Sequence, residues 1–120
     1  MEIWVNPACS KCRTATAALD EAGVDYTVRR YLEDPPTVNE LEAVLDRLRL
    51  EPWDVARTSE KAAHEVGLAD LPRDAEHRAE WVARMVAQPI LIQRPIITND
   101  HGESVIGRTP EALQQVLGQR

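Results

Sequence analysis

Hydrophobic positions over the first third of the chain follow a strand, helix, strand pattern. Residues 3–5 form a short apolar run, Ile-Trp-Val, that ends at Asn6-Pro7 and predicts a buried strand. Helical spacing follows over residues 10–22, and Gly23 is a typical residue to end a helix. A second strand is expected over residues 26–31, which completes a βαβ unit with parallel strands. The helix is expected to bury one stripe of side chains, formed by Cys12, Ala15, Leu19 and Ala22.

The middle of the chain is predicted to be helical. Thr37-Val38-Asn39-Glu40 matches a capping box, in which the Thr and Glu side chains bond each other's backbone N–H groups. Short helices are expected over residues 52–56 and 59–66, and Asp74 can cap a further helix that ends before Pro89. The apolar faces of the two longer helices consist of Leu41, Val44, Leu45, Leu48, Trp81, Val82, Met85 and Val86.

The end of the chain returns to β-structure. Residues 90–92 and 95–98 are expected to be extended, and a turn over residues 99–102 leads into a closing strand at 104–106. Thr109-Pro110 then begins a last helix, because Thr is a good cap and Pro fits the first helical position. The order predicts an α/β protein with a thioredoxin-like fold and a helical insertion between its βαβ and ββα halves. At 120 residues, we expect one domain spanning 1–120.

Composition and charge narrow the classes of function. Apolar residues make up 43% and charged residues 28% of the chain, as in ordinary globular proteins. The net charge of −6 argues against sequence-independent binding to nucleic acid phosphates. Neither a signal peptide nor a run of about 18 apolar residues is seen, so we expect a cytoplasmic protein that does not act at a membrane.

The chain's only two cysteines, Cys9 and Cys12, lie one helical turn apart at the predicted start of the first helix. Unsatisfied N–H groups and the positive end of the helix dipole lower the pKa of a thiol there, from ~8.5 to roughly 3.5–7.5 in Cys-x-x-Cys sites. The arrangement predicts a reactive thiolate at Cys9. Two alternatives are a pair of thiols packed like small apolar residues, and a zinc site. Zinc needs four ligands, and the three histidines show no paired spacing, so no metal is expected.

Four segments in a fixed order cover essentially the whole chain. The segments are Asn6-Pro7-Ala8-Cys9 with Arg13, then Tyr31-Leu32-Glu33-Asp34-Pro35-Pro36, then Arg57 ten residues before Gly67-Leu68-Ala69, and lastly Gln88-Pro89-Ile90-Leu91-Ile92-Gln93-Arg94-Pro95-Ile96. In this order they resemble the glutaredoxin-coupled arsenate reductases. That family also contains redox-sensing transcriptional regulators, known as Spx, which bind RNA polymerase.

The resemblance implies the parts of a catalytic site. Cys9 would be the nucleophile that attacks arsenate, and Pro95 would follow a cis peptide bond that faces it. The oxyanion would be held by arginines, which stay protonated and offer a planar fork of donors. These arginines are Arg13, Arg57, Arg94 and Arg108. Cys12, three residues after Cys9, is within reach for a disulfide. A small thiol such as glutathione or a mycothiol-type compound can serve instead, followed by a glutaredoxin-like partner.

Three positions bear on the branch of the family. Val5 stands where some reductases have histidine, and Cys12 stands where well-known reductases lack a thiol and the regulators carry their second cysteine. Arg108, however, fits the reductase pattern and is typically absent from the regulators. We therefore expect a thiol-dependent oxidoreductase that reduces arsenate to arsenite with glutathione, thioredoxin or glutaredoxin as reductant and no bound cofactor. The alternatives are a regulator that contacts RNA polymerase through a Cys9–Cys12 disulfide switch, and a reductase of another small oxyanion or disulfide.

Overall fold

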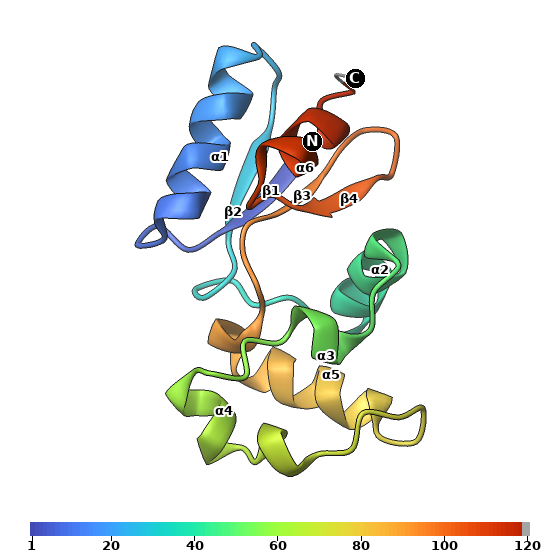
Figure 1. Ribbon diagram of the computed structural model, residues 1–120. Helices are drawn as coiled ribbons and strands as arrows, with labels where there is room; N and C mark the ends of the chain where they lie inside the picture. The colour runs from blue at the N-terminus through green and yellow to red at the C-terminus, as the bar shows by residue number, and fades with distance from the viewer. Residues whose placement is uncertain (119–120) are drawn as a thin grey trace. The chain divides into compact units, whose positions relative to one another are not determined.

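The computed structural model describes residues 1–118, and its contacts divide the chain into two compact units. One unit joins Met1–Asp34 to the segment that begins at Arg94, and the other is formed by Pro35–Gln93 (Figure 1). The expectation of a single domain stays a prediction, and each unit is described by itself below.

The first unit is built on a four-stranded sheet. Its strands are β1 (Glu2–Val5), β2 (Thr27–Arg30), β3 (Ile96–Thr98) and β4 (Ser104–Ile106), in the order β2-β1-β3-β4 (Figure 1). Strands β1 and β2 are parallel, whereas β3 is antiparallel to both β1 and β4. The βαβ unit and the C-terminal hairpin predicted from the sequence therefore share one sheet.

Helices α1 (Ser10–Glu21) and α6 (Pro110–Val116) cover the same face of this sheet. The register places Ile3 opposite Ile97 and Ile97 opposite Val105, so these side chains form one row on that face. Side chains of both helices pack against this row in a single buried cluster. The helical contribution to the cluster comprises Cys12, Ala15, Leu19 and Val116.

The ends of α1 and α6 follow from local sequence. Helix α6 has Thr109 as its cap, whose hydroxyl accepts a hydrogen bond from the Ala112 N–H at 3.1 Å. Helix α1 ends one residue before Ala22, and Gly23 follows in the left-handed conformation at φ 72°. The prediction that Ala22 is buried was wrong, because this residue is the exposed C-cap of the helix.

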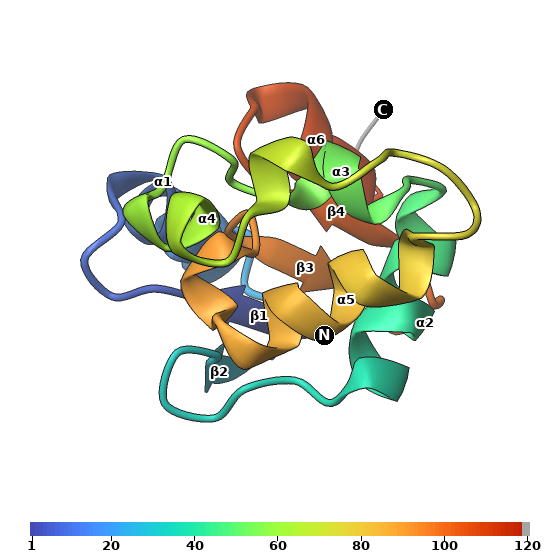
Figure 2. The same cartoon turned by 90° about the horizontal axis from the view of Figure 1, so that it is seen from below.

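The elements of the second unit are all helices. These are α2 (Val38–Leu48), α3 (Pro52–Val55), α4 (Lys61–Glu65), η1 (Leu68–Asp70), α5 (Arg78–Ala87) and η2 (Pro89–Leu91) (Figures 1 and 2). The capping box at the start of α2 is present, with hydrogen bonds of 3.0 and 3.1 Å between Thr37 and Glu40. Helix α5 packs against α2 and α3, and its Trp81 side chain is fully buried.

Two expectations for this unit were wrong. Residues 90–92 do not form a strand, because Pro89 begins the 3₁₀ helix η2, closed by a bond from the Leu91 N–H to the Gln88 carbonyl at 2.9 Å. Only Ile92 makes an isolated bridge, to Ala56. Helix α5 is capped by His77 rather than by Asp74, whose carboxylate accepts from the His77 N–H at 3.0 Å one turn earlier.

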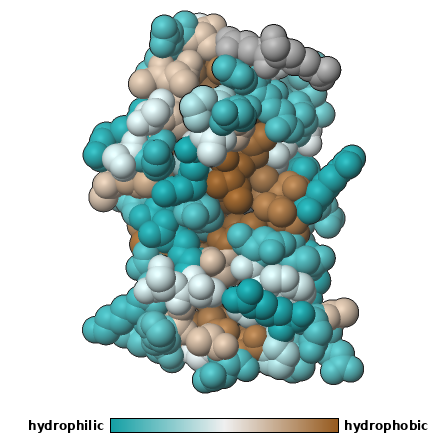
Figure 3. All heavy atoms as spheres, in the orientation of Figure 1, coloured by the Kyte–Doolittle hydropathy of each residue, from teal (hydrophilic) through white to brown (hydrophobic). Residues whose placement is uncertain are grey.

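Exposed side chains on the face seen in Figure 3 are mostly hydrophilic, with smaller hydrophobic patches between them. Large apolar side chains exposed within residues 1–118 include Val28, Leu32 and Val38. Over the same residues, every helix is too short or too polar to cross a bilayer.

Candidate active site

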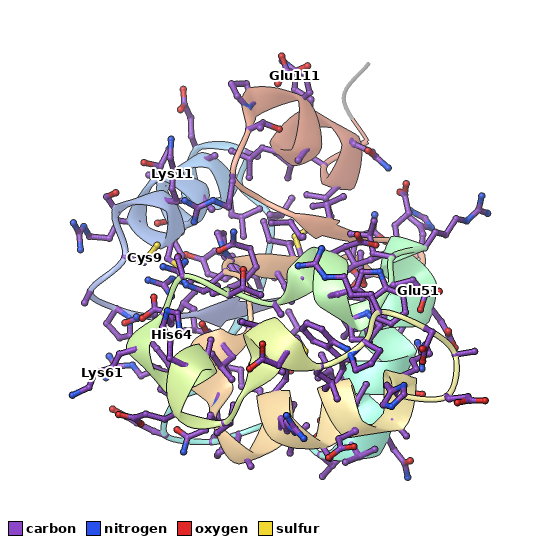
Figure 4. All side chains as sticks on the ribbon, turned by 60° about the horizontal axis from the view of Figure 1, so that its bottom comes forward. Cys9, Lys11, Glu51, Lys61, His64 and Glu111 are labelled. Carbon is purple, nitrogen blue, oxygen red and sulfur yellow. The ribbon has the colours of Figure 1, made fainter. Side chains whose placement is uncertain are left out.

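Cys9 stands at the junction between β1 and α1, where a tight turn sets its position. The Asn6 carbonyl accepts from the Cys9 N–H at 2.9 Å, and the Asn6 side chain accepts from the Ala8 N–H at 3.0 Å. Cys9 is the N-cap of α1 and has extended backbone angles (φ −89°, ψ 123°). Its sulfur lies at the beginning of the helix, while the exposed Lys11 side chain points away from it (Figure 4).

The surroundings of Cys9 stabilise its thiolate. Burial on its own would raise the pKa of this thiol, but hydrogen bonds to the sulfur outweigh it and lower the pKa to about 6. The donors are the Cys12 backbone N–H, the Arg94 guanidinium, the Cys12 thiol and the Lys11 backbone N–H. Two of these donors are N–H groups of the first helical turn, which is the arrangement predicted from the sequence. At neutral pH Cys9 is therefore mainly a thiolate.

The Cys12 thiol behaves in the opposite way. Burial raises its pKa to about 11, and its hydrogen bond to the Cys9 sulfur and the negative charge there act in the same direction. The Asn6 backbone N–H and the charge of Arg94 oppose this rise without cancelling it. Cys12 thus stays protonated beside the Cys9 thiolate and donates to it, and the two cysteines form no disulfide in this structure.

Arg94 is the arginine that directly contacts the nucleophile. Its guanidinium donates hydrogen bonds to the Cys9 sulfur and to the phenol oxygen of Tyr31. The bond from Arg94 to Pro95 is cis, and the Arg94 carbonyl accepts from Arg108 Nη1 at 2.9 Å. Both the backbone and the side chain of Arg94 are therefore held in place.

Gly107 allows the chain to pass close to β3 just before Arg108. A Cβ at this position would lie 2.7 Å from the Ile97 side chain, so a larger residue would displace that side chain. The Gly107 N–H donates to the Pro95 carbonyl at 2.8 Å. Arg108 is thus brought beside the Arg94-Pro95 segment by the close packing of β3 and β4.

Arg13 lies on the exposed side of the first turn of α1. Its Nη1 donates to the Pro7 carbonyl at 3.1 Å, so it closes the turn that carries Cys9. Its assignment to the oxyanion stays a prediction.

Arg57 belongs to the second unit and is held there by two side chains. Its Nε and Nη2 donate to Glu60 Oε1 at 3.1 and 2.9 Å, and its Nη1 donates to Gln93 Oε1 at 2.9 Å. The side chains of Arg57 and Glu60 are 21% and 28% exposed, so the pair is largely shielded from water. This pairing fixes the direction of the Arg57 guanidinium within its own unit.

Three contacts of these residues were not predicted from the sequence. Tyr31 contacts Arg94, and Glu60 and Gln93 contact Arg57. Tyr31 and Gln93 lie inside the segments that carry the family resemblance, which is the signal that could have drawn attention to them. In residues 1–118, no group of three or more His, Cys, Asp or Glu side chains is placed to hold a metal ion.

Together these observations define a thioredoxin-like protein: βαβ and ββα halves in one sheet, a cysteine at the start of the first helix, and a cis-proline before β3. A model of the ArsC family matches residues 4–116. The chain belongs to the ArsC family.

Individual relatives agree with this assignment. The chain is 57% identical to a Streptomyces viridochromogenes protein described as an uncharacterized protein in the glnII region, and the match covers 98% of each. It is 33% identical to an arsenate reductase of Neisseria meningitidis, over 98% of this chain and 97% of the relative. A solved structure of an arsenate reductase from Vibrio cholerae superimposes with a TM-score of 0.79 at 33% identity, covering 100% of this chain and 98% of that one. The predicted fold class and the resemblance to this family are confirmed.

Proposed function

We propose that the protein is a thiol-dependent arsenate reductase that forms arsenite through an adduct on Cys9. The observation that carries this proposal is the Cys9 thiolate, with a pKa of about 6, hydrogen-bonded to a fixed arginine. The names of its relatives from Neisseria meningitidis and Vibrio cholerae support arsenate as the substrate. Because the family match spans residues 4–116, we also infer that the chain works as one functional domain.

The proposed reaction transfers two electrons from sulfur to arsenic. The Cys9 thiolate attacks the arsenic of arsenate, and one oxygen leaves as water after taking up protons. A second thiol then attacks the Cys9 sulfur, the sulfur–arsenic bond breaks, and its electron pair stays on arsenic. Arsenic(V) thereby becomes arsenic(III), released as arsenite, while two thiols become one disulfide.

Cys12 is the second thiol that this chain itself supplies. While Cys9 is a thiolate, its charge and its hydrogen bond help to keep Cys12 protonated. A bond between Cys9 and arsenic takes the charge off the sulfur to which Cys12 donates, and the remaining negative charge lies on the arsenate oxygens, where arginines would offset it. With the effect of Arg94 on Cys12 unchanged, deprotonation of Cys12 becomes easier once the adduct has formed. Glutathione or a similar small thiol is the alternative resolving group.

Arginines would provide the charge that lets an anionic thiolate approach an anionic substrate. Arg94 touches the nucleophile, and Arg108 binds the Arg94 carbonyl, which supports roles for both at the oxyanion. The roles of Arg13 and Arg57 rest on the family resemblance alone.

The test is arsenate-dependent oxidation of NADPH by the purified protein, coupled in parallel to thioredoxin with its reductase and to glutathione with glutaredoxin. Arsenite is measured directly as the product. Turnover in either arm supports the proposal and identifies the reductant, whereas absence of arsenite in both arms contradicts it.

A redox-sensing regulator is the second candidate, and the Cys9–Cys12 pair is the observation that favours it. A pull-down of RNA polymerase from the host, with reduced and oxidised protein, separates the two proposals. Stable binding that depends on the redox state supports the regulator. Arsenite production without such binding supports the enzyme.

A further inference from the structure

We propose that Tyr31 is a positioning residue, whose buried phenol holds the Arg94 guanidinium against the Cys9 sulfur. The arrangement links three segments that are far apart in the sequence: the end of β2, the loop before β3 and the start of α1. Tyr31 has no role in the proposed transfer of electrons, so its contribution is the orientation of a charged side chain.

The strand registers place these three segments at one edge of the sheet. Strands β1 and β2 are parallel with Val5 opposite Arg30, so Asn6 and Tyr31 leave the sheet side by side. Strand β3 is antiparallel to β1 with Trp4 opposite Ile96, and continuing this register places Arg94 level with Asn6. The turn from Asn6 leads directly to Cys9. Tyr31 and Arg94 thus flank the loop of the nucleophile.

Burial distinguishes Tyr31 from its neighbours. Its side chain is fully buried, whereas Arg30 before it and Leu32 after it are exposed. A phenol that is removed from water needs a hydrogen-bond partner. The Arg94 guanidinium supplies one, since it donates to the phenol oxygen as well as to the Cys9 sulfur.

A second acceptor restricts the movement of the Arg94 guanidinium. Arginine carries a rigid fork of donors on a flexible stem, so a single contact with sulfur leaves the group free to rotate. The guanidinium meets both Tyr31 and Cys9, and since its Nε and Nη1 atoms are buried without a hydrogen-bond partner among residues 1–118, both contacts fall to Nη2. The backbone at Arg94 is held separately by Arg108, at 2.9 Å from the Arg94 carbonyl. With both ends fixed, the charge stays next to the thiolate before any substrate arrives.

The test compares Tyr31→Phe with Tyr26→Phe, which are the only two such changes this chain allows. Each removes one phenol oxygen, but the Tyr26 hydroxyl donates to Asp20 at 2.6 Å on the exposed surface. The readout is the rate of Cys9 alkylation by iodoacetamide as a function of pH. Trypsin cleaves after Lys11 and separates the two cysteines, so mass spectrometry assigns the label to Cys9. Circular dichroism checks that both variants fold.

We expect Tyr31→Phe to raise the pKa of Cys9 by about one unit, the lower end of the 1–3 units that an adjacent opposite charge contributes. Alkylation at pH 6 should then fall about fivefold, because the thiolate fraction falls from about one half to about one tenth. Tyr26→Phe should leave the curve unchanged. A Cys9 pKa that is unchanged or lowered in a folded Tyr31→Phe variant would overturn the proposal.

A double-mutant cycle with Arg94→Gln separates positioning from general packing. If Tyr31 acts through Arg94, then Tyr31→Phe should have no further effect on the Cys9 pKa once Arg94 is replaced. Additive effects of the two changes would show that Tyr31 acts by another route and would overturn the proposal. The measurement needs no arsenate, so its outcome is independent of whether the proposed reductase function is correct.

Discussion

Cys9 and Cys12 are the same chemical group one helical turn apart, yet their surroundings move their pKa values in opposite directions. Four hydrogen-bond donors converge on Cys9 and outweigh its burial, whereas burial and the neighbouring thiolate dominate at Cys12. Because their pKa values differ in this way, only one of the two thiols is ionised at neutral pH, and the two can take different roles in a reaction. Cys9 is suited to attack first, and Cys12 is suited to attack second.

The first prediction concerns this division of tasks. Cys9→Ser should abolish arsenate reduction, because an alcohol is not ionised at neutral pH, whereas Cys12→Ser should slow turnover or shift its dependence toward an added small thiol. Arsenite release by each variant, with and without glutathione, is the measurement. Activity retained in Cys9→Ser would end its assignment as the nucleophile, and complete loss in both variants would show that the Cys9–Cys12 disulfide is obligatory.

A second prediction uses the hydrogen bond between the two cysteines. Cys12→Ala removes the thiol donor and should raise the pKa of Cys9 above its value of about 6. Cys12→Ser keeps a hydroxyl donor and should raise it less, since a hydrogen bond to the ionised form stabilises that form. Thiolate absorbance near 240 nm as a function of pH measures both variants. Equal pKa values in Cys12→Ala and the parent protein would mean that the thiol donor has no effect.

At the scale of helices and strands, the sequence correctly predicts those elements whose residues follow a clear local pattern. The βαβ unit, the capping box before α2 and the C-terminal hairpin are all predicted because strand period, helix period and turn residues agree there. Residues 90–92 have the composition of a strand, but Pro89 fixes a helical turn at that point. The 3₁₀ helix η1 has no distinctive pattern and was not predicted.

Side-chain contacts between different elements cannot be predicted from the local sequence pattern. The sequence singles out Cys9 because its position at a helix start has a direct chemical consequence. The contact of Tyr31 with Arg94 depends on how β2 and β3 align with β1, which is settled only when the sheet forms. The pairing of Arg57 with Glu60 and Gln93 likewise joins the start of α4 to the end of η2. Neither contact has a signature within one element.

The third prediction concerns that pairing and rests on the proposed role of Arg57. Glu60 holds Arg57 through two hydrogen bonds and neutralises its charge. Glu60→Gln keeps the side-chain shape but removes the negative charge, so arsenate no longer competes with a carboxylate. With a partly exposed pair worth up to about 1 kcal/mol, KM for arsenate should fall by up to about fivefold.

Steady-state kinetics at fixed reductant concentration measures this change, with Lys61→Gln, at the next position along the chain, as a control outside the pair. A KM that rises in Glu60→Gln would show that the carboxylate orients Arg57 rather than competing with its ligand. An unchanged KM in both variants would separate Arg57 from substrate binding.

Two properties, family membership and net charge, belong to the whole molecule and not to any single residue or element. The resemblance to the family rests on four segments in a fixed order along the chain, and the family model matches residues 4–116. Net charge is equally a property of the whole, and at −6 it repels anions at long range. An oxyanion must therefore be recognised by local positive groups, and Arg94 meets the nucleophile directly.

The fourth prediction is a dependence of global stability on pH that originates at Cys9. The pKa of this thiol is lowered from 9.0 to about 6 on folding, so between these values the unfolded chain binds more protons than the folded one. Stability from this group therefore rises with pH, is fully present above pH 9, and is lost as pH falls through about 6. Cys12, whose pKa is raised to about 11, lowers stability only above pH 9.

Urea unfolding under reducing conditions at pH 6, 7.5 and 9 tests this for the parent protein and for Cys9→Ser. The serine variant lacks the Cys9 thiol, and a Cys9→Ser, Cys12→Ser double variant compared with Cys12→Ser removes any contribution of Cys12, so the difference in unfolding free energy isolates the Cys9 thiolate. That difference should grow with pH by up to about 4 kcal/mol, at about 1.4 kcal/mol per pKa unit. Any loss of packing in Cys9→Ser is independent of pH and shifts the difference without changing its slope. A difference that stays constant from pH 6 to 9 would mean that the folded protein does not stabilise the Cys9 thiolate, and the chemistry proposed for this site would lose its physical basis.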